Sequence, residues 1–140
     1  MLPETTGSNL PLEGIRVLEF THAVMGPSAG LILADLGAEV IHIEPPHGDS
    51  TRRLKGMGSG YFSFFNRNKK SLAVDIKRSE GRAILEQLIP TADVIVENFG
   101  PGTMDRLGFG YEHCKALRED LVYCALKGFC ALENLVQITK

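Results

Sequence analysis

The sequence predicts an α/β fold in which a Rossmann-like parallel sheet carries helices on both faces. Two observations predict it. Short apolar runs rich in β-formers alternate with segments of helical periodicity along the chain, and this alternation is typical of parallel sheets. In addition, the stretch from Gly14 to Asp35 has the pattern of a buried strand, a short turn and a helix. That unit holds phosphates and nucleotides at helix N-termini in many α/β proteins.

The expected elements follow in chain order. Strands are predicted over 15–20, 40–43, 71–76, 93–96 and 121–126. Helices are predicted from Pro27 to Leu36, from a capping Ser79 to Ile89, over 103–107 and over 111–118. Gly37 is placed to end the first helix in a left-handed conformation. We expect the second helix to bury Ile84, Leu85, Leu88 and Ile89, and the segment 47–60 to form a long functional or mobile loop.

Length and composition limit the function classes. The chain has 140 residues, enough for about one domain, and its hydrophobic content of 44% with 23% charged residues is typical of a globular protein. A net charge of −2 gives no electrostatic case for nucleic-acid binding. No apolar run is long enough for a membrane span. The odd cysteines Cys114, Cys124 and Cys130 lack a C-x-x-C spacing, which indicates reduced thiols in a cytoplasmic protein.

Three stretches follow predicted strands at the edge where open α/β sheets bind ligands: 21–30, 69–77 and 97–106. The first lacks the three-glycine dinucleotide fingerprint, although Glu44 lies where a ribose-binding acid is expected, so a nicotinamide site stays open as an alternative. In the third, Gly100 and Gly102 flank a proline, and Asn98 adds an amide for recognition. The alternative for the first and third stretches is a simple turn between a strand and a helix.

The cations of 66–70 and the four histidines are further candidates for ligand binding. Residues 66–70 bring three cations near Arg52, Arg53 and Lys55, a pattern that fits either a solvated face or a phosphate site. The four histidines show no metal-ligand spacing. His42 alternates with isoleucines in a strand and is expected to be structural, whereas His22 lies in the first turn, near any ligand there.

Linked motifs in the correct order resemble the family III CoA-transferases. They are L-x-G-I-x-V-L-E-F-T at 12–21 with G-P at 26–27, L-G-A-E-V-I-x-I-E at 36–44, F-x-x-x-N-R-N-K-K-S at 62–71, D-V-x-V-E-N-F-x-P-G at 93–102 and M-x-x-L-G at 104–108. This family includes formyl-CoA:oxalate and carnitine CoA-transferases and the related α-methylacyl-CoA racemases. The resemblance predicts a disordered lead-in at 1–11, a Rossmann-like CoA-binding domain at 12–129 and a truncated segment at 130–140.

The resemblance implies an enzyme that moves CoA from an acyl-CoA to a carboxylic acid acceptor. Coenzyme A binds as a substrate, no cofactor is covalently held, and two full-length chains interlock in a homodimer. The turn at Ala23, Val24 and Met25 is expected beside the CoA thiol. Contacts to CoA are implied for Val74, Asp75, Ile76, Lys77, Asn98, Phe99 and Gly100, and a phosphate or nucleotide contact for Arg106.

The chain departs from the family pattern at three places. Val24 replaces the Gln of the oxalate-type enzymes, and Pro45 replaces an Arg, so one adenine-side contact is expected to be either missing or supplied by Arg52 or Arg53. The family's nucleophilic Asp is expected beyond residue 140, since Glu133 matches a different acid of the family. We therefore expect the CoA-binding part of such an enzyme without its catalytic residue. The alternatives are a non-catalytic CoA-binding or dimerising fragment and, from another class, a nicotinamide-dependent oxidoreductase domain.

Overall fold

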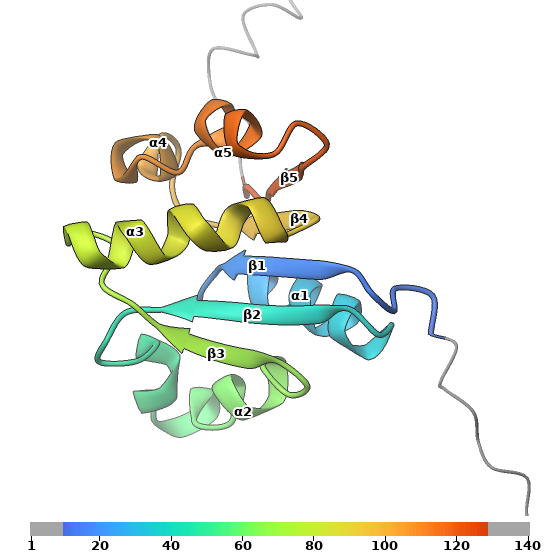
Figure 1. Cartoon of the computed structure of the whole chain (residues 1–140). Coiled ribbons are helices and arrows are strands. Elements are labelled where there is room, and N and C mark those ends of the chain that lie inside the picture. The colour runs from blue at the N-terminus through green and yellow to red at the C-terminus, as the bar shows by residue number, and fades with distance from the viewer. Residues whose placement is uncertain (1–9, 129–140) are drawn as a thin grey trace, which may run out of the picture.

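The computed structural model describes residues 10–128, which form a five-stranded parallel sheet flanked by helices (Figure 1). The strands are β1 (Arg16–Phe20), β2 (Glu39–Glu44), β3 (Lys70–Ala73), β4 (Val94–Glu97) and β5 (Val122–Ala125). The helices are α1 (Met25–Asp35), α2 (Tyr61–Phe65), α3 (Ser79–Leu88), α4 (Thr103–Leu107) and α5 (Tyr111–Leu117), with short 3-10 turns η1 (Ser50–Arg53), η2 (Gly56–Gly58) and η3 (Ile89–Thr91). The predictions for most of the lead-in and for 130–140 lie outside the described residues.

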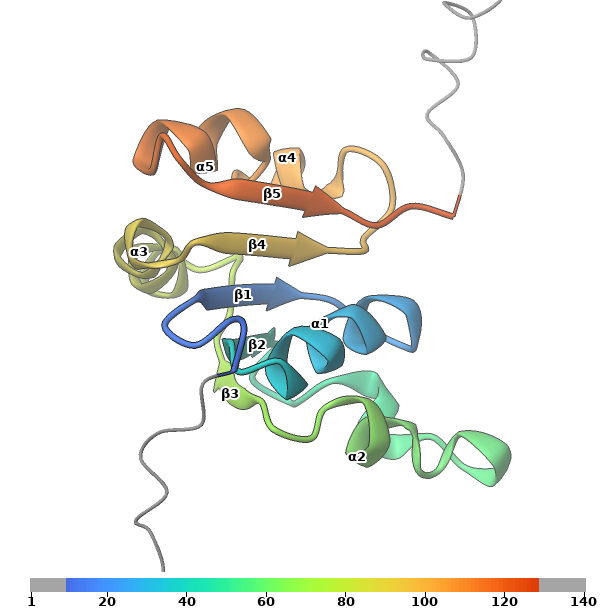
Figure 2. The same cartoon turned by 90° about the vertical axis from the view of Figure 1, so that its right-hand side faces the viewer.

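The strand order β3-β2-β1-β4-β5 places the first strand at the centre of the sheet. Strand β1 pairs with β2 from Arg16↔Glu39 and with β4 up to Phe20↔Glu97, in both cases parallel. All carboxyl ends therefore lie at one edge, as the common direction of the arrows shows (Figure 2). The chain order reverses at β1, so the loops after β1 and β4 lie side by side there, at the position where open sheets bind ligands.

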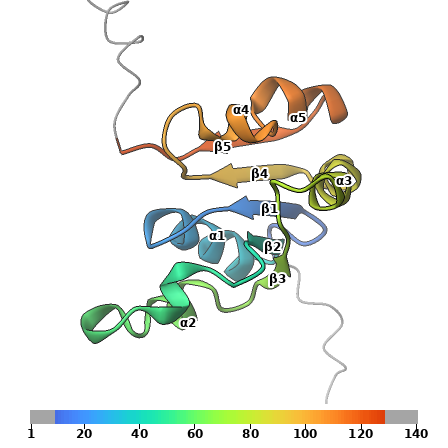
Figure 3. The same ribbon diagram turned by 90° about the vertical axis from the view of Figure 1, so that its left-hand side faces the viewer.

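The sheet is buried on both faces. In Figure 1, α3 crosses in front of the sheet and α1 lies behind it. Leu18, Phe20 and Ile95 pack with Leu85 of α3 on the first face, and Val17 and its neighbours pack with α1 on the second. Seen from the left-hand side of Figure 1, β5 and β3 are the two outer strands, with α2 close to β3 (Figure 3). Double burial explains the continuous apolar runs of the central strands.

Most predicted elements are confirmed within a few residues, and Gly37 has the positive φ of +103° expected of it. Strand β3 begins one residue earlier and ends three residues earlier than predicted. The predicted cap at Ser79 is wrong: Arg78 is the N-cap residue, and the Ser79 hydroxyl bonds the Glu80 carboxylate. Ile84 was expected to be buried but is 49% exposed.

The predicted loop at 47–60 contains two 3-10 turns, and the aromatic cluster after it forms helix α2. None of the helices within residues 10–128 is long and apolar enough to cross a membrane.

Candidate functional site

A cleft of about 410 Å³ lies at the carboxyl edge of the sheet. It is bounded by the ends of β1 and β2, by the segments that follow β2, β3 and β4, and by α4. Its lining residues are Phe20, Ile43, Glu44, Pro45, Pro46, His47, Val74, Asp75, Ile76, Lys77, Phe99 and Leu107. The lining is mostly apolar, while the exposed Lys77 carries a positive charge at its rim. Such a cleft fits a flat apolar ring with an anionic group beside it.

The segment after β3 is fixed by two local contacts. The backbone N–H of Val74 bonds the Glu44 carbonyl, which closes the last pair between β2 and β3, and the Lys77 N–H bonds the Asp75 carboxylate at 3.0 Å. Helix α3 then approaches closely at Gly81, where a Cβ would overlap the carbonyl oxygen of Asp75. Four predicted site residues, Val74 to Lys77, therefore form one wall of the cleft.

The turn between β1 and α1 lies at the same edge. Its residues from His22 to Met25 are exposed, and Ala23 adopts a left-handed φ of +62°. Helix α1 begins at Met25, two residues before the predicted start, and Val24 is its N-cap residue without a side-chain cap. Pro27 is tolerated because it lies in the first helical turn. The first N–H groups of this helix precede any intrahelical partner and face the edge of the sheet.

The turn after β4 joins the first turn directly. The amide of Asn98 bonds the backbone of His22, and the His22 and Phe99 rings stack with centroids 5.5 Å apart. Phe99 also lines the cleft, and its N–H donates to the Glu97 carboxylate at 2.9 Å. Gly100 lines a second hollow of about 370 Å³ near α4 and β5 instead. The predicted residues of both turns are thus neighbours, although 76 positions separate His22 from Asn98.

Arg106 lies outside the walls of both hollows. It is exposed on α4, and its guanidinium donates to the Thr103 hydroxyl at 2.8 Å and to the Pro101 carbonyl at 3.4 Å. Its side chain is therefore near the turn after β4, at the same edge of the sheet as Lys77.

Comparisons with known proteins identify the family. The model of CoA-transferase family III matches residues 12–133. The chain belongs to CoA-transferase family III. It is 48% identical over 122 residues to a formyl-CoA:oxalate CoA-transferase of Streptomyces coelicolor, covering 84% of this chain and 30% of that protein. It is 46% identical over 123 residues to an acetyl-CoA:oxalate CoA-transferase of Acetobacter aceti, covering 85% and 32%.

Solved structures agree with this assignment. A hypothetical protein of Mycobacterium tuberculosis matches with a TM-score of 0.82 and 42% identity, over 87% of this chain and 35% of that one. A CAIB/BAIF family protein of Brucella suis matches with a TM-score of 0.79 and 40% identity, over 87% and 34%. The chain therefore spans about a third of the length of the family members it matches.

The three cations of 66–70 all form ion pairs within the chain. Lys69 is buried and donates to Glu19 at 2.9 Å, Arg67 pairs with Asp35, and Lys70 pairs with Glu39. Burial opposes the charge of Lys69 and lowers its pKa. Each cation therefore pairs with a carboxylate from an earlier part of the chain, which favours a structural role for this cluster over the phosphate interpretation.

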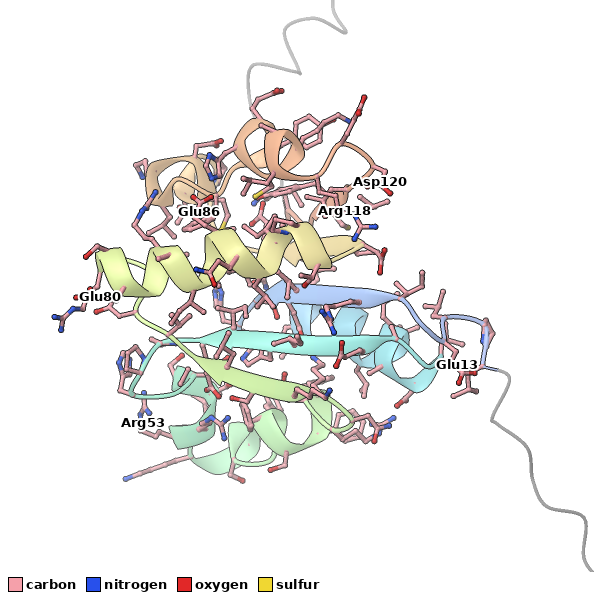
Figure 4. The ribbon with its side chains drawn as sticks, viewed as in Figure 1. Glu13, Arg53, Glu80, Glu86, Arg118 and Asp120 are labelled. Carbon is pink, nitrogen blue, oxygen red and sulfur yellow. The ribbon has the colours of Figure 1, made fainter. Side chains whose placement is uncertain are left out.

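Arg52 is occupied in the same way. It forms two bonds to the Glu44 carboxylate at 2.8 and 2.5 Å and lies 3.7 Å from the ring centroid of Phe62. The Arg52 guanidinium holds the pKa of Glu44 at about 2, so this acid stays charged and paired. Glu44 has no free oxygen for a ribose, which weakens the nicotinamide alternative. Arg53 is exposed in η1 after β2 (Figure 4), and its guanidinium donates to the His47 carbonyl.

A buried polar cluster lies behind the site, on the α1 face. Glu19 accepts from Lys69 and from the Thr21 hydroxyl, and the His42 ring lies 3.7 Å from Glu19 and 3.3 Å from Asp49. Burial opposes a charge on His42, but contacts with Asp49 and Glu19 outweigh it and raise its pKa to about 9. The structural role predicted for His42 agrees with this environment.

Sequence reasoning missed the residues that support the site. Gly30 allows α1 to pass over the Glu19 carboxylate, where a Cβ would lie 2.7 Å from an oxygen, and Gly81 does the same for the segment after β3. The only available signal was a glycine inside a helical pattern, which often marks close packing. Across residues 10–128, no group of histidine, cysteine and acidic side chains is arranged to hold a metal ion.

Proposed function

We propose that this chain is the CoA-binding part of a family III CoA-transferase, which moves CoA from an acyl-CoA to a carboxylic acid. The observation that carries the proposal is the apolar cleft beside Lys77, which shares one sheet edge with the turn at Ala23 to Met25. Family membership supplies the chemistry, and the two relatives above are named for transfers between an acyl-CoA and oxalate.

In this proposal the CoA lies along the edge of the sheet. Its adenine enters the cleft between Ile76 and Phe99, because an aromatic ring is best accommodated by apolar walls. Lys77 and Arg106 are exposed cations at this edge and contact the phosphates. The pantetheine arm then runs toward the turn after β1, so that the thioester lies beside Val24 and Met25.

The acceptor is proposed to be a carboxylic acid whose identity depends partly on Val24. This side chain is 37% exposed and offers no hydrogen-bonding group. The oxalate-type enzymes have Gln at this position, so we propose that the acceptor is recognised here through apolar contact. A buried hydrogen-bonding site rejects a substrate that leaves its groups unpaired, and Val24 imposes no such requirement.

The nucleophile is proposed to lie outside the described residues. Each buried carboxylate near the edge of the sheet already has a cationic partner: Lys69 for Glu19, Arg52 for Glu44, His42 for Asp49 and Lys127 for Glu97. A carboxylate held in an ion pair is a poor acyl acceptor, because attack on a thioester removes its charge. The family's Asp is therefore proposed to come from another part of the protein.

We also propose that the whole protein is a cytoplasmic homodimer. Exposed apolar side chains lie on two neighbouring helices: Met25 and Ile32 of α1, Leu36 directly after α1, and Phe64 of α2. Exposed apolar surface of this kind is typical of faces that another chain or domain covers.

Calorimetric titration of this chain with CoA and with NAD tests the proposal. We expect CoA to bind and NAD not to bind. Lys77→Ala and Arg106→Ala should each weaken CoA binding by roughly 10- to 100-fold, because a charge-assisted contact contributes about 1.5–3 kcal/mol.

Lys70→Ala is the matched control, since Lys70 is an exposed cation at the amino end of β3, on the opposite edge of the sheet. Binding of NAD without binding of CoA contradicts the proposed function. Unchanged CoA affinity in both variants removes Lys77 and Arg106 from the site.

A further inference from the structure

Both polar ends of the Asn98 side chain are engaged within the protein. The Oδ1 atom accepts the backbone N–H of His22 at 3.0 Å, and the Nδ2 atom donates to the His22 carbonyl, also at 3.0 Å. The carboxamide thus pairs with one residue as a neighbouring strand would. It continues the β1–β4 pairing beyond Phe20↔Glu97, where the Asn98 N–H bonds the Phe20 carbonyl at 3.4 Å.

The backbone that Asn98 holds is a costly one. Ala23, the next residue after His22, has a φ of +62°, a left-handed conformation that disfavours any residue with a Cβ. Such conformations persist where surrounding contacts over-determine them, and they cluster at functional sites. Two contacts hold the backbone next to Ala23 in place: the pair of hydrogen bonds between Asn98 and His22, and the stacking of the His22 ring on Phe99.

The start of helix α1 is adapted to the same side chain. A Cβ on Gly26 would lie 2.8 Å from Cγ of Asn98 and 2.5 Å from Cβ of Thr21. Only glycine leaves room for the carboxamide to pass between the helix and His22. Asn98 therefore sets the position of the turn relative to both β4 and the first residues of α1.

We propose that Asn98 is a positioning residue: its carboxamide fixes the Ala23–Met25 turn for the thioester end of CoA and makes no contact with CoA itself. The proposal rests on the function proposed above. It assigns Asn98 a supporting role in place of the direct CoA contact that the sequence resemblance implied, because one N–H and one lone pair of the amide are held by His22 and fix its orientation. Asn98 also links the two turns, so that the position of Val24 at the thioester end is fixed relative to Phe99 in the cleft.

The chemistry of the pair explains why asparagine is required. One backbone residue presents an N–H and a C=O, and a carboxamide of this length complements both. Aspartate keeps the acceptor but turns a second oxygen toward the His22 carbonyl. Alanine removes both bonds. Neither substitution alters the walls of the cleft, which Asn98 does not line.

The test compares two ligands in Asn98→Ala, Asn98→Asp and the unmodified chain. CoA has the pantetheine arm, whereas 3′-phosphoadenosine 5′-diphosphate has the same nucleotide without it. We expect both variants to bind CoA about tenfold more weakly and to bind the nucleotide within about twofold of the unmodified chain. Asn68→Gly is the matched control, because it removes an exposed amide that bonds Asp35 and its φ of +63° suits glycine.

Amide hydrogen exchange at His22, followed by NMR, is the second readout. We expect exchange at least tenfold faster in Asn98→Ala than in the unmodified chain, with the amides of β1 and β4 unchanged. This readout needs no ligand. If the unmodified chain fails to bind CoA while His22 responds as expected, the proposed function is contradicted and the positioning of the turn is supported.

Three results overturn the proposal. The first is an equal loss of affinity for CoA and for the nucleotide, which indicates a direct contact to the nucleotide. The second is unchanged His22 exchange in Asn98→Ala, and the third is unchanged CoA affinity in both variants. If Asn98→Ala does not fold, exchange of the Asn98 side-chain amide protons in the unmodified chain tests the proposal instead. Slow exchange supports the hydrogen-bonded carboxamide, and fast exchange contradicts it.

Discussion

At the scale of single residues, His42 controls the charge balance of the polar cluster behind the site. When His42 is protonated, three carboxylates and three cations balance: Glu19, Glu44 and Asp49 against His42, Arg52 and Lys69. Loss of that proton leaves one buried negative charge without compensation. Buried charges are costly unless they are paired, so the stability of this cluster should depend on pH.

The sign of this dependence follows from the raised pKa. His42 ordinarily titrates near 6.5 and titrates at about 9 in the fold, so its contribution is complete below pH 6.5 and is lost as the pH rises through 9. We expect a loss on the order of 3 kcal/mol in the free energy of unfolding over that range. Lys69 acts in the opposite sense, because burial lowers its pKa.

Urea unfolding at pH 6, 7.5 and 9 measures this dependence. His42→Gln should be less stable at pH 6 and should show a much flatter slope, while the exposed His113→Gln serves as the control. An unchanged slope in His42→Gln means that His42 is neutral in the fold.

Gly100 and Gly102 make a second contrast at the residue scale. A Cβ at Gly100 would meet only the Thr103 hydroxyl at 3.9 Å, and its φ is not positive, whereas Gly102 has a φ of +68°. We expect Gly100→Val to keep its thermal stability and to lose CoA binding, since the side chain blocks approach to the backbone. Gly102→Val should instead lose about 1 kcal/mol or more of stability. Normal CoA binding by Gly100→Val shows that this glycine serves only the fold.

At the scale of elements, sequence patterns predicted which segments form strands and helices but not which helix faces are covered. Ile32 of α1 and Ile84 of α3 have the apolar character of core positions, yet they are 60% and 49% exposed. The apolar periodicity of a helix shows which side chains share a face, whereas the burial of that face depends on which other elements pack against it. The short apolar run of β1 was more informative, because a central parallel strand is covered on both faces.

Gly81 gives an element-scale prediction that opposes helix propensity. Alanine is the better helix former by about 1 kcal/mol, yet its Cβ would overlap the Asp75 carbonyl that lines the cleft. Gly81→Ala must therefore displace α3 or the 74–77 segment, at a cost of about 1–3 kcal/mol. We expect a lower melting temperature and weaker CoA binding. Gln87→Ala, an exposed change in the same helix, should alter neither. A more stable Gly81→Ala variant means that the helix and the segment separate freely.

At the scale of the molecule, the fold could be predicted from the sequence, whereas the side-chain contacts within the site could be predicted only in part. Linked strands and helices in a fixed order suffice for a parallel sheet, and its carboxyl edge then gathers the turns after each strand. Which side chain faces the ligand depends on partners distant in sequence. Asn98 and Lys69 illustrate this, since the residues that they bond, His22 and Glu19, lie 76 and 50 positions away.

The last prediction concerns the activity of these 140 residues by themselves. Acyl transfer through a carboxylate requires an uncompensated acid placed at the thioester in a pocket that excludes water. The buried acids at the sheet edge are paired, and the turn at Val24 and Met25 is exposed. We therefore expect the chain to bind CoA without transferring it. Incubation with an acyl-CoA and a panel of dicarboxylic acids, followed by mass spectrometry, should reveal neither exchanged acyl-CoA nor a covalent adduct above a protein-free control. An adduct on Glu133, which lies outside the described residues, or any exchanged acyl-CoA, means that these residues already contain the nucleophile.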